Sequence, residues 1–149
     1  MPSKDEVGKA LVGKRVRKVG GRRYRGREGQ VVGVRDWPVQ PSSVAPYVWV
    51  MGLVPGSPRA SISVCYINLE LVGDDIPRIG HLCNSGSLGA RFRYLEGGIP
   101  TGSVYRVITA DAETVTYESE GPSVRTWTAR PGNRFWEQQI ELCGRAGED

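Results

Sequence analysis

Short segments in which hydrophobic and polar residues alternate are the main pattern along this chain. Between residues 61 and 66, Ile62, Val64 and Tyr66 alternate with small Ser and Cys residues, which is the period of a strand with one buried face. Comparable runs, bounded by turns rich in Gly and Pro, predict strands at residues 30–37, 47–54, 61–71, 91–95, 103–108, 114–118 and 124–128, and a strand or short helix at 135–142. The spacing predicts a mostly β protein of two small antiparallel barrels in tandem.

Signals near the start and in the middle of the chain divide it into segments. Ser3 and Glu6 have the spacing of a capping box, so a short N-terminal helix is predicted to run through Leu11. The sequence Gly-Asp-Asp-Ile-Pro at residues 73–77 is typical of a boundary. The expected organisation is an N-terminal arm or short helix at 1–10, a first barrel at 11–72, a linker at 73–89, a second small β-barrel at 90–144 and a frayed tail at 145–149.

Length and composition narrow the class of protein. A chain of 149 residues is long enough for one domain or two very small ones. It contains no run of about 20 apolar residues that would span a membrane, and no signal peptide is expected. The 20 Gly and 10 Pro residues favour short strands joined by tight turns over a helical bundle. We therefore expect a cytoplasmic protein with no membrane partner.

The three cysteines and the single histidine are the candidates for a metal site. An odd number of cysteines without a signal sequence favours free thiols in a reducing compartment. Cys65, His81, Cys83 and Cys143 could together supply four ligands to zinc, but strong zinc motifs place their ligands in closely spaced pairs. Only His81 and Cys83 are close in sequence, so buried thiols are the favoured interpretation and no cofactor is expected.

Charge is distributed unevenly along the chain. The net charge is +4, yet residues 1–35 contain eleven Lys or Arg against three acidic residues, a net charge of +8, and residues 36–149 carry −4. Sixteen of the twenty basic residues are Arg, whose planar guanidinium matches the geometry of phosphate and stacks on bases. A basic and polarised end is typical of a protein that binds a polyanion.

The basic residues concentrate in the segment GGRRYRGREG, residues 20–29. Gly26 and Gly29 are expected to permit the positive φ of a tight loop between strands. Four arginines would then project from one short loop with Tyr24 between them, where guanidinium groups can hold phosphates and the ring can stack on an unpaired base. A solvated basic hairpin without a ligand is the alternative interpretation.

The segment at residues 13–34 resembles the KOW motif of ribosomal proteins and of the NusG family of transcription elongation factors. The matching residues are Gly13, Val16, the loop Arg22–Arg27, Gly29, Val31 and Val34. The spacing G-x-x-G-x-V-x-x-V at residues 26–34 is the most specific part, and residues 68–72 are similar to the strand that closes such domains. The resemblance covers residues 11–72 and implies an SH3-like barrel that often binds RNA or a ribonucleoprotein, although the Pro-rich insertion at 38–46 is longer than the usual hairpin loop.

The second half carries no family motif of comparable specificity. Its hairpin TVTYESEG, residues 114–121, and its closing segment RFWEQQIEL, residues 134–142, are similar to small phage-encoded proteins of unknown function. This likeness is one of composition, and it implies no particular chemistry.

The residues expected to bind nucleic acid lie in the basic segment and on the strands beside it. They are Arg15, Arg17, Lys18, Arg22, Arg23, Tyr24, Arg25, Arg27, Arg35 and Trp37. If the first strand alternates, Arg15 and Arg17 share a face and Val16 points inward. Trp37 is a candidate stacking residue because it stands before Pro38 at a strand end. The other tryptophans are expected in the cores: Trp49, Trp127 and Trp136.

No catalytic constellation is recognisable, because the carboxylate pairs Asp74–Asp75 and Glu118–Glu120 are expected in solvated turns. We therefore predict a non-enzymatic nucleic-acid-binding protein. RNA or a ribonucleoprotein is favoured over duplex DNA, because no recognition helix for a major groove is evident. The acidic second half is a candidate protein-binding domain. The alternative is a protein-interaction module, for example a phage-encoded inhibitor that binds a host enzyme or nucleoprotein complex.

Overall fold

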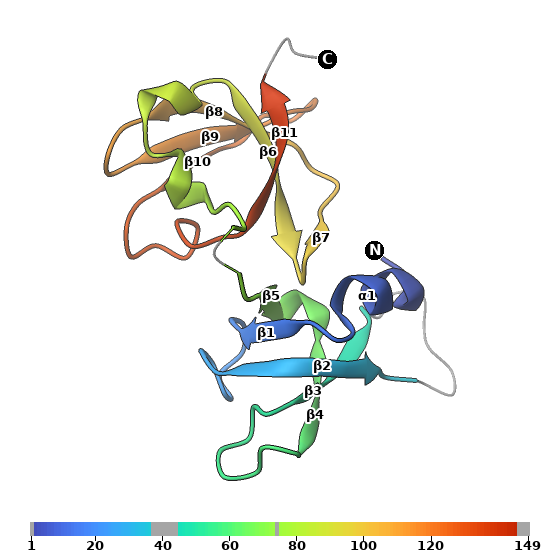
Figure 1. Ribbon diagram of the computed structural model, residues 1–149. Coiled ribbons are helices and arrows are strands. Elements are labelled where there is room, and N and C mark those ends of the chain that lie inside the picture. The colour runs from blue at the N-terminus through green and yellow to red at the C-terminus, as the bar shows by residue number, and fades with distance from the viewer. Residues whose placement is uncertain (1, 37–44, 74, 146–149) are drawn as a thin grey trace. The chain divides into compact units, whose positions relative to one another are not determined.

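The chain divides into two compact units, each built on one antiparallel sheet (Figure 1). The computed structural model describes residues 2–36, 45–73 and 75–145. The first unit comprises Met1–Gly73 and Glu96–Ile99, and the second comprises Asp74–Leu95 and Pro100–Asp149. The expected mostly β class with one short α-helix is confirmed for the described residues. Within these ranges no helix is long and apolar enough to cross a membrane.

Five strands form the sheet of the first unit, in the order β4-β3-β2-β1-β5. The elements of this unit are α1 (Lys4–Leu11), β1 (Arg15–Lys18), β2 (Glu28–Val34), β3 (Tyr47–Met51), β4 (Ser61–Cys65), the 3-10 turn η1 (Tyr66–Asn68) and β5 (Leu69–Leu71). Val16 of β1 lies opposite Gly29 of β2 on one side and opposite Leu71 of β5 on the other. The first and last strands of the unit are therefore neighbours.

Helix α1 begins where the capping box predicts it. The Ser3 hydroxyl accepts a hydrogen bond from the backbone N–H of Glu6 at 3.2 Å. Val7 and Leu11, four residues apart on one face of the helix, are fully buried in the first core. The helix ends before Gly13, which has a φ of +83°. Burial of its apolar face, rather than intrinsic propensity, stabilises a helix this short.

Residues 61–71, expected as one strand, form two strands separated by a turn. The alternation ends at Tyr66, which is buried, and η1 redirects the chain from β4 to β5. Because of this break, one continuous segment supplies both edges of the sheet: β4 pairs with β3, and β5 pairs with β1.

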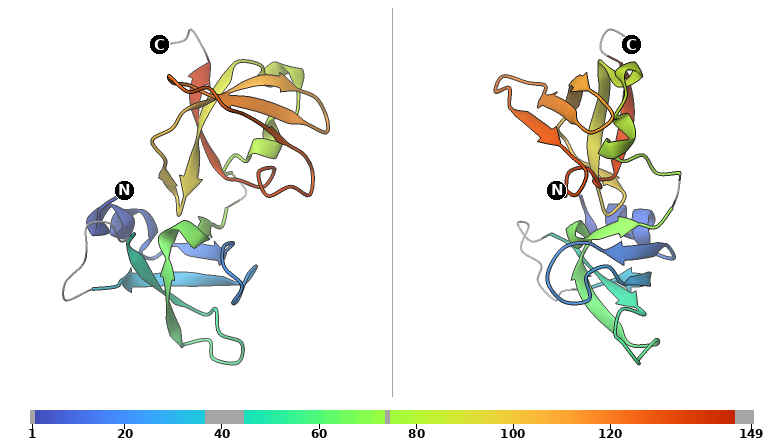
Figure 2. Two further views of the ribbon diagram at one scale, coloured as in Figure 1. Left: turned by 180° about the vertical axis from the view of Figure 1, so that it is seen from behind. Right: turned by 90° about the vertical axis from the view of Figure 1, so that its left-hand side faces the viewer.

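The second unit contains a sheet of order β10-β9-β8-β6-β11, in which β7 also pairs with β6 (Figure 2). The elements that carry this sheet are the 3-10 turns η2 (Ile79–Leu82) and η3 (Ser85–Ser87) and the strands β6 (Ala90–Glu96), β7 (Ile99–Pro100), β8 (Tyr105–Ala110), β9 (Val115–Ser119), β10 (Thr126–Ala129) and β11 (Ile140–Arg145). The end of β6 and the start of β7 fall in the segment Glu96–Ile99, which belongs to the first unit. The β10–β9, β9–β8, β8–β6 and β6–β11 pairings are antiparallel.

Residues 73–89, expected as a linker, contribute to the second core. Ile79 and Leu82 of η2 are buried there. The backbone N–H of Gly80 donates to the carbonyl oxygen of Trp136 at 2.9 Å, and a Cβ at Gly80 would lie 2.5 Å from the indole nitrogen. The segment carries too few apolar residues to show a period, so its burial follows from tertiary packing.

Both sheets are open, so the expected closed barrels are not confirmed. The strand order ends at β4 and β5 in the first sheet and at β10 and β11 in the second. Among the described residues, no ladder joins the two ends of either sheet. Edge strands of this kind present backbone N–H and C=O groups that no neighbouring strand pairs.

An aromatic cluster fills the second core. Phe92 and Tyr117 are fully buried, with ring centroids 5.2 Å apart, and Trp127 stacks on Tyr117 at 5.8 Å. The hydroxyls of Tyr94 and Tyr117 lie 2.7 Å apart. Burial raises the pKa of Tyr117 to about 12, and burial together with the hydrogen bond to Tyr117 raises the pKa of Tyr94. Trp127 and Trp136 both pack against this core, which agrees with their expected place.

Candidate nucleic-acid interface

The loop between β1 and β2, residues 19–27, is the basic loop. The backbone N–H of Gly26 donates to the carbonyl oxygen of Lys18 at 2.8 Å. The backbone N–H of Lys18 donates to the carbonyl oxygen of Arg27 at 3.0 Å. These two bonds continue the β1–β2 ladder beyond the strands. The two ends of the loop are therefore hydrogen-bonded to each other, and the loop starts where Figure 1 shows the end of β1.

Lys18, one of the residues expected to bind nucleic acid, supports the basic loop from inside. It is 7% exposed, and its Nζ donates to the carbonyl oxygens of Gly20 and Arg23, each at 2.7 Å. Burial and the positive charge of Arg25 lower the pKa of Lys18. Strand alternation places Lys18 on the same side as Val16, so its ammonium faces inward. Its cation orders the loop backbone.

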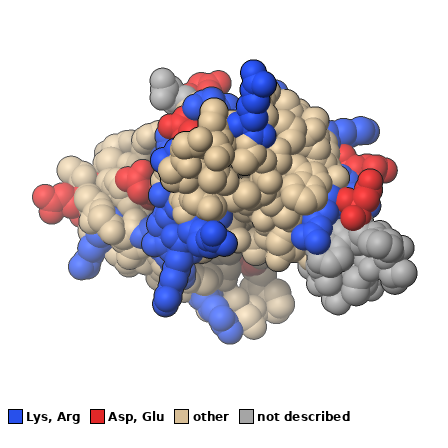
Figure 3. Space-filling view, turned by 90° about the horizontal axis from the view of Figure 1, so that it is seen from below, with Lys and Arg blue, Asp and Glu red and all other residues tan. Residues whose placement is uncertain are grey.

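Four arginines of the basic loop remain exposed: Arg22, Arg23, Arg25 and Arg27. Within the described residues no ion pair joins any of them to an acidic side chain. Arg25 Nε donates to the carbonyl oxygen of Gly21 at 3.0 Å, which holds that guanidinium against the loop. In the view of Figure 3, several Lys and Arg side chains form one large group, and others are scattered over the same face.

Tyr24 occupies an unusual backbone conformation. Its φ of +59° is the only positive value at a non-glycine position among the described residues. Such a conformation costs an L-residue roughly 1–2 kcal/mol, so the rest of the loop must hold it in place. The guanidinium carbon of Arg23 lies 5.4 Å from the centre of the Tyr24 ring, and Arg23 Nη2 lies 3.4 Å from its hydroxyl. The two side chains thus form one surface, half apolar and half cationic.

Arg15 and Arg17, expected to bind nucleic acid, are already paired with acidic residues of the same unit. Arg15 Nε lies 3.3 Å from Glu28 Oε1. Arg17 Nη1 lies 2.8 Å from Glu70 Oε1, and its Nη2 lies 3.6 Å from Glu28 Oε2. The pairing with Glu70 depends on the β1–β5 register, which the local sequence pattern does not show.

Arg35 follows β2 at the end opposite the basic loop. Its guanidinium carbon lies 5.8 Å from the centre of the Trp49 ring, and its Nη1 donates to the Ser63 hydroxyl at 3.2 Å. Trp49 is 37% exposed, so the expectation that it belongs to the core is wrong. Trp37, the other expected stacking residue, lies outside the described residues.

Gly26 and Gly29 are required for different reasons. Gly26 has a φ of +83°, as a tight loop demands. Gly29, expected to share that property, instead lies buried in β2 without a positive φ. A Cβ at Gly29 would lie 2.5 Å from the carbonyl oxygen of Met51, so glycine allows β2 and β3 to approach closely at this point.

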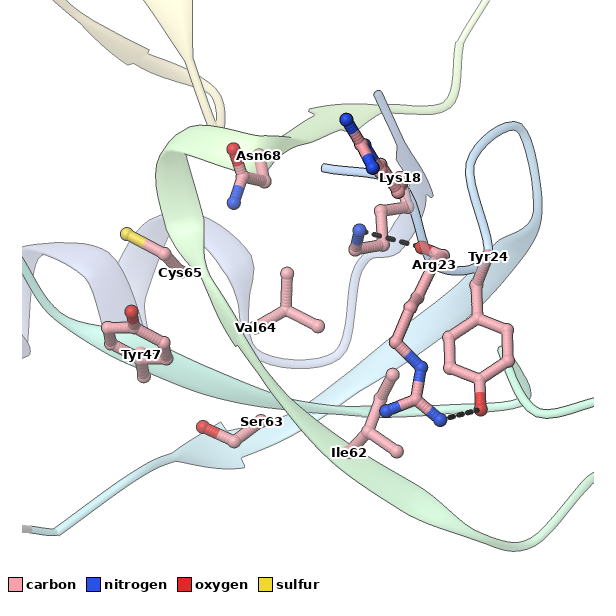
Figure 4. Close-up of a pocket in the computed structure, with 10 residues that line it drawn as sticks. Lys18, Arg23, Tyr24, Tyr47, Ile62, Ser63, Val64, Cys65 and Asn68 are labelled. Atoms are coloured by element: carbon pink, nitrogen blue, oxygen red, sulfur yellow. Dashed lines mark hydrogen bonds between the residues drawn. The ribbon is translucent and has the colours of Figure 1, made fainter. Parts of the chain in front are cut away.

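A hollow of about 340 Å³ opens beside the basic loop and was not expected from the sequence (Figure 4). Arg23 and Tyr24 of the loop line one side, and Ile62 and Val64 of β4 line another. Asn68, at the end of η1, lines it as well. The available signal in the sequence was the single Asn within the otherwise largely apolar run at residues 64–72.

In the second unit, the acidic residues of the predicted hairpin pair with arginines. Glu118 accepts a hydrogen bond from Arg106, and Arg91 Nε lies 2.8 Å from Glu120 Oε2. No group of three or more His, Cys, Asp or Glu side chains within the described residues is placed to hold a metal ion. The cysteines carry no disulfide, and Cys65 is buried.

No protein-family model matches this chain, and no curated protein matches it at a significant level. The assignment of a function therefore depends on the residues of the basic loop and on the hollow beside it.

Proposed function

We propose that this protein is a non-enzymatic nucleic-acid-binding protein whose basic loop holds the phosphates of RNA, free or within a ribonucleoprotein. The observation that supports this most strongly is the set of four exposed arginines between residues 22 and 27, which have no ion-pair partner among the described residues. Arginine forms charge-assisted, often bidentate hydrogen bonds with phosphate. Since Lys18 already orders the loop backbone, binding costs less conformational entropy than in a free loop.

Unpaired RNA is favoured over duplex DNA. The Tyr24 ring, half-buried and fixed beside Arg23, offers a surface on which an unpaired base can stack. Helix α1, the α-helix within the described residues, has eight residues and buries Val7 and Leu11 in the first core. A helix committed to the core in this way is poorly suited to enter a major groove.

The salt dependence of binding tests this proposal. A labelled single-stranded RNA of about 12 nucleotides is titrated with the protein at several salt concentrations, and anisotropy gives the dissociation constant. Substitution of Arg22, Arg23, Arg25 and Arg27 together by Ala should weaken binding strongly. It should also reduce the slope of log K against log salt by up to about 3, since each phosphate contact with a single strand contributes about 0.7.

A matched variant controls for net charge. Substitution of Arg59, Arg93, Arg125 and Arg130 by Ala removes the same four charges at positions outside the basic loop. This variant should keep most of the affinity. Equal weakening by both variants would show that only the overall charge matters, and the site would be rejected. If nuclease-treated lysate instead yields a protein that the wild type retains and the basic-loop variant loses, the protein-interaction alternative is favoured.

A further inference from the structure

The Asn68 side chain faces the hollow without a hydrogen-bond partner among the described residues. Its backbone carbonyl oxygen accepts hydrogen bonds from the N–H groups of Val19 and Gly20 at 2.9 and 3.2 Å, so the residue is held in place. Gly20 makes room for the amide, because a Cβ there would lie 2.2 Å from Asn68 Oδ1. A fixed, half-buried amide that offers both a donor and an acceptor is suited to recognise a ligand.

Lys18 contributes a second polar group to the wall of the hollow. An ammonium has three N–H donors, and two of those on Lys18 bond to the carbonyl oxygens of Gly20 and Arg23. Figure 4 shows the ammonium in the wall between the basic loop and β4. One donor is therefore left for a ligand oxygen or ring nitrogen.

The remaining walls of the hollow are apolar or cationic. Ile62 and Val64 supply aliphatic surface from β4, and Tyr24 supplies an aromatic ring. Arg22 and Arg23 line the side formed by the basic loop. A volume of about 340 Å³ is within the usual range of small-molecule sites. The ligand that satisfies all of these groups has a ring, a polar ring edge and an attached anion.

We infer that this hollow binds one unpaired nucleotide of the RNA. The base lies against Ile62 and Val64, its polar edge bonds to the Asn68 amide, and its phosphate is held by Arg22 and Arg23. The inference rests on the proposed function, because the strand reaches the hollow from the basic loop. Base pairing hides the polar edge of a base, so the site selects single-stranded over duplex RNA.

Nuclear magnetic resonance of the unaltered full chain tests this assignment directly. Spectra of ¹⁵N-labelled protein are recorded with each of the four nucleoside 5′-monophosphates, with inorganic phosphate and with hexaglutamate. The Asn68 side-chain amide signals should shift with at least one nucleotide at concentrations at which phosphate leaves them unchanged. A response to hexaglutamate alone would assign the hollow to an acidic peptide and overturn the inference. So would a response no larger than that to phosphate.

Variants of Asn68 separate this inference from the proposed function. Asn68→Ala should weaken binding of single-stranded RNA about tenfold and leave binding of an RNA duplex of the same length within about twofold. The salt slope should not change, because Asn68 contacts no phosphate. Asn68→Asp, which replaces the amide donors by a negative charge, should lose at least as much affinity for single-stranded RNA as Asn68→Ala.

The outcomes for the two sites are distinguishable. If the four-arginine variant loses binding and both Asn68 variants bind single strands like the wild type, the proposed function stands and the nucleotide site is overturned. If Asn68→Ala weakens single-strand and duplex binding equally, the site is also overturned. If neither the arginine nor the Asn68 variants lose affinity, both proposals fall. If a variant fails to fold, the nucleotide titration of the unaltered chain decides whether the hollow binds a nucleotide.

Discussion

The two units have similar sheets but use their arginines differently. In the second unit, Arg106 lies directly opposite Glu118 in the β8–β9 ladder and bonds to it. In the first unit, Arg17 lies opposite Glu28 on one side and Glu70 on the other, and pairs with both. Cross-strand neighbours of opposite charge stabilise a sheet and neutralise each other.

The arginines of the basic loop have no such cross-strand partners among the described residues. They stand beyond the ends of β1 and β2, and none of them takes part in a strand pairing. Their charge therefore remains available to a ligand. The comparison shows that register and position, more than composition, decide which arginines can bind an external anion. Four predictions test this division between structural and available groups.

The largest effect is expected from the aromatic core of the second unit. Phe92 is fully buried, so Phe92→Ala should lower the free energy of unfolding of that unit by about 3–5 kcal/mol. Urea unfolding measures the loss, and Phe92→Leu should cost less. RNA affinity under native conditions should change less than about twofold. A parallel loss of affinity in protein whose first unit remains folded would contradict the division of roles.

A smaller effect is expected from the buried cation of the first unit. Lys18→Met removes two hydrogen bonds and leaves the carbonyl oxygens of Gly20 and Arg23 unsatisfied. The free energy of unfolding of the first unit should therefore fall by about 1–3 kcal/mol. RNA affinity should fall as the basic loop loses order. Lys14→Met removes the same charge from an exposed position and is the control. Equal affinities of the two variants would show that Lys18 does not order the loop.

The tyrosine pair predicts a dependence on alkaline pH. Tyr117 has a pKa of about 12 and the pKa of Tyr94 is also raised, whereas an unfolded tyrosine ionises near pH 10. The folded state keeps these protons longer, so the contribution of this pair to the free energy of unfolding should be constant below about pH 10 and fall as the pH rises above it. Tyr94→Phe should cost about 1 kcal/mol at pH 7, because Tyr117 loses its partner.

Tyr94→Phe should also make the fall in the free energy of unfolding above about pH 10 less steep, because one of the two titrating hydroxyls is gone. Urea unfolding at pH 7, 9 and 11 provides the measurement. Tyr24→Phe, in the other unit, controls for loss of a tyrosine hydroxyl. An alkaline decline equally steep in Tyr94→Phe and in the wild type would rule out this pair as its source.

The smallest effect is expected from Arg15. This residue already pairs with Glu28, so Arg15→Ala should change RNA affinity by less than about twofold. Arg22→Ala, which removes an unpaired cation from the basic loop, should weaken binding several-fold more. The two dissociation constants, measured in the same buffer, compare a paired arginine directly with an unpaired one. If the two losses were equal, pairing within the sheet would not decide which arginines bind.

Several features of the fold could be predicted because they depend on residues close in sequence. The cap of α1 requires only Ser3 and Glu6, and the positive φ of Gly26 belongs to one turn. The mostly β class follows from short alternating runs. The break in residues 61–71 was missed, because both of its strands have the same local pattern and their different partners lie elsewhere.

Of the candidate site, too, only the part formed by residues close in sequence could be predicted. The cluster of arginines between residues 22 and 27 is visible in the sequence, since it is a contiguous segment. The hollow was not, because Asn68 and Ile62 reach the basic loop only through the folding of the sheet. Tyr24 was expected to be a stacking residue, yet its backbone conformation gave no signal in the sequence.

By itself the sequence determined the local features: a short capped helix, many brief strands and a concentration of positive charge in one loop. Only the tertiary structure decided that Lys18 faces inward, that Arg17 meets Glu70 and that Ile79 joins the second core. The physical reason is that each of these contacts depends on how distant strands and turns pair and pack. A shift of one residue in register would turn a strand's side chains to the opposite face.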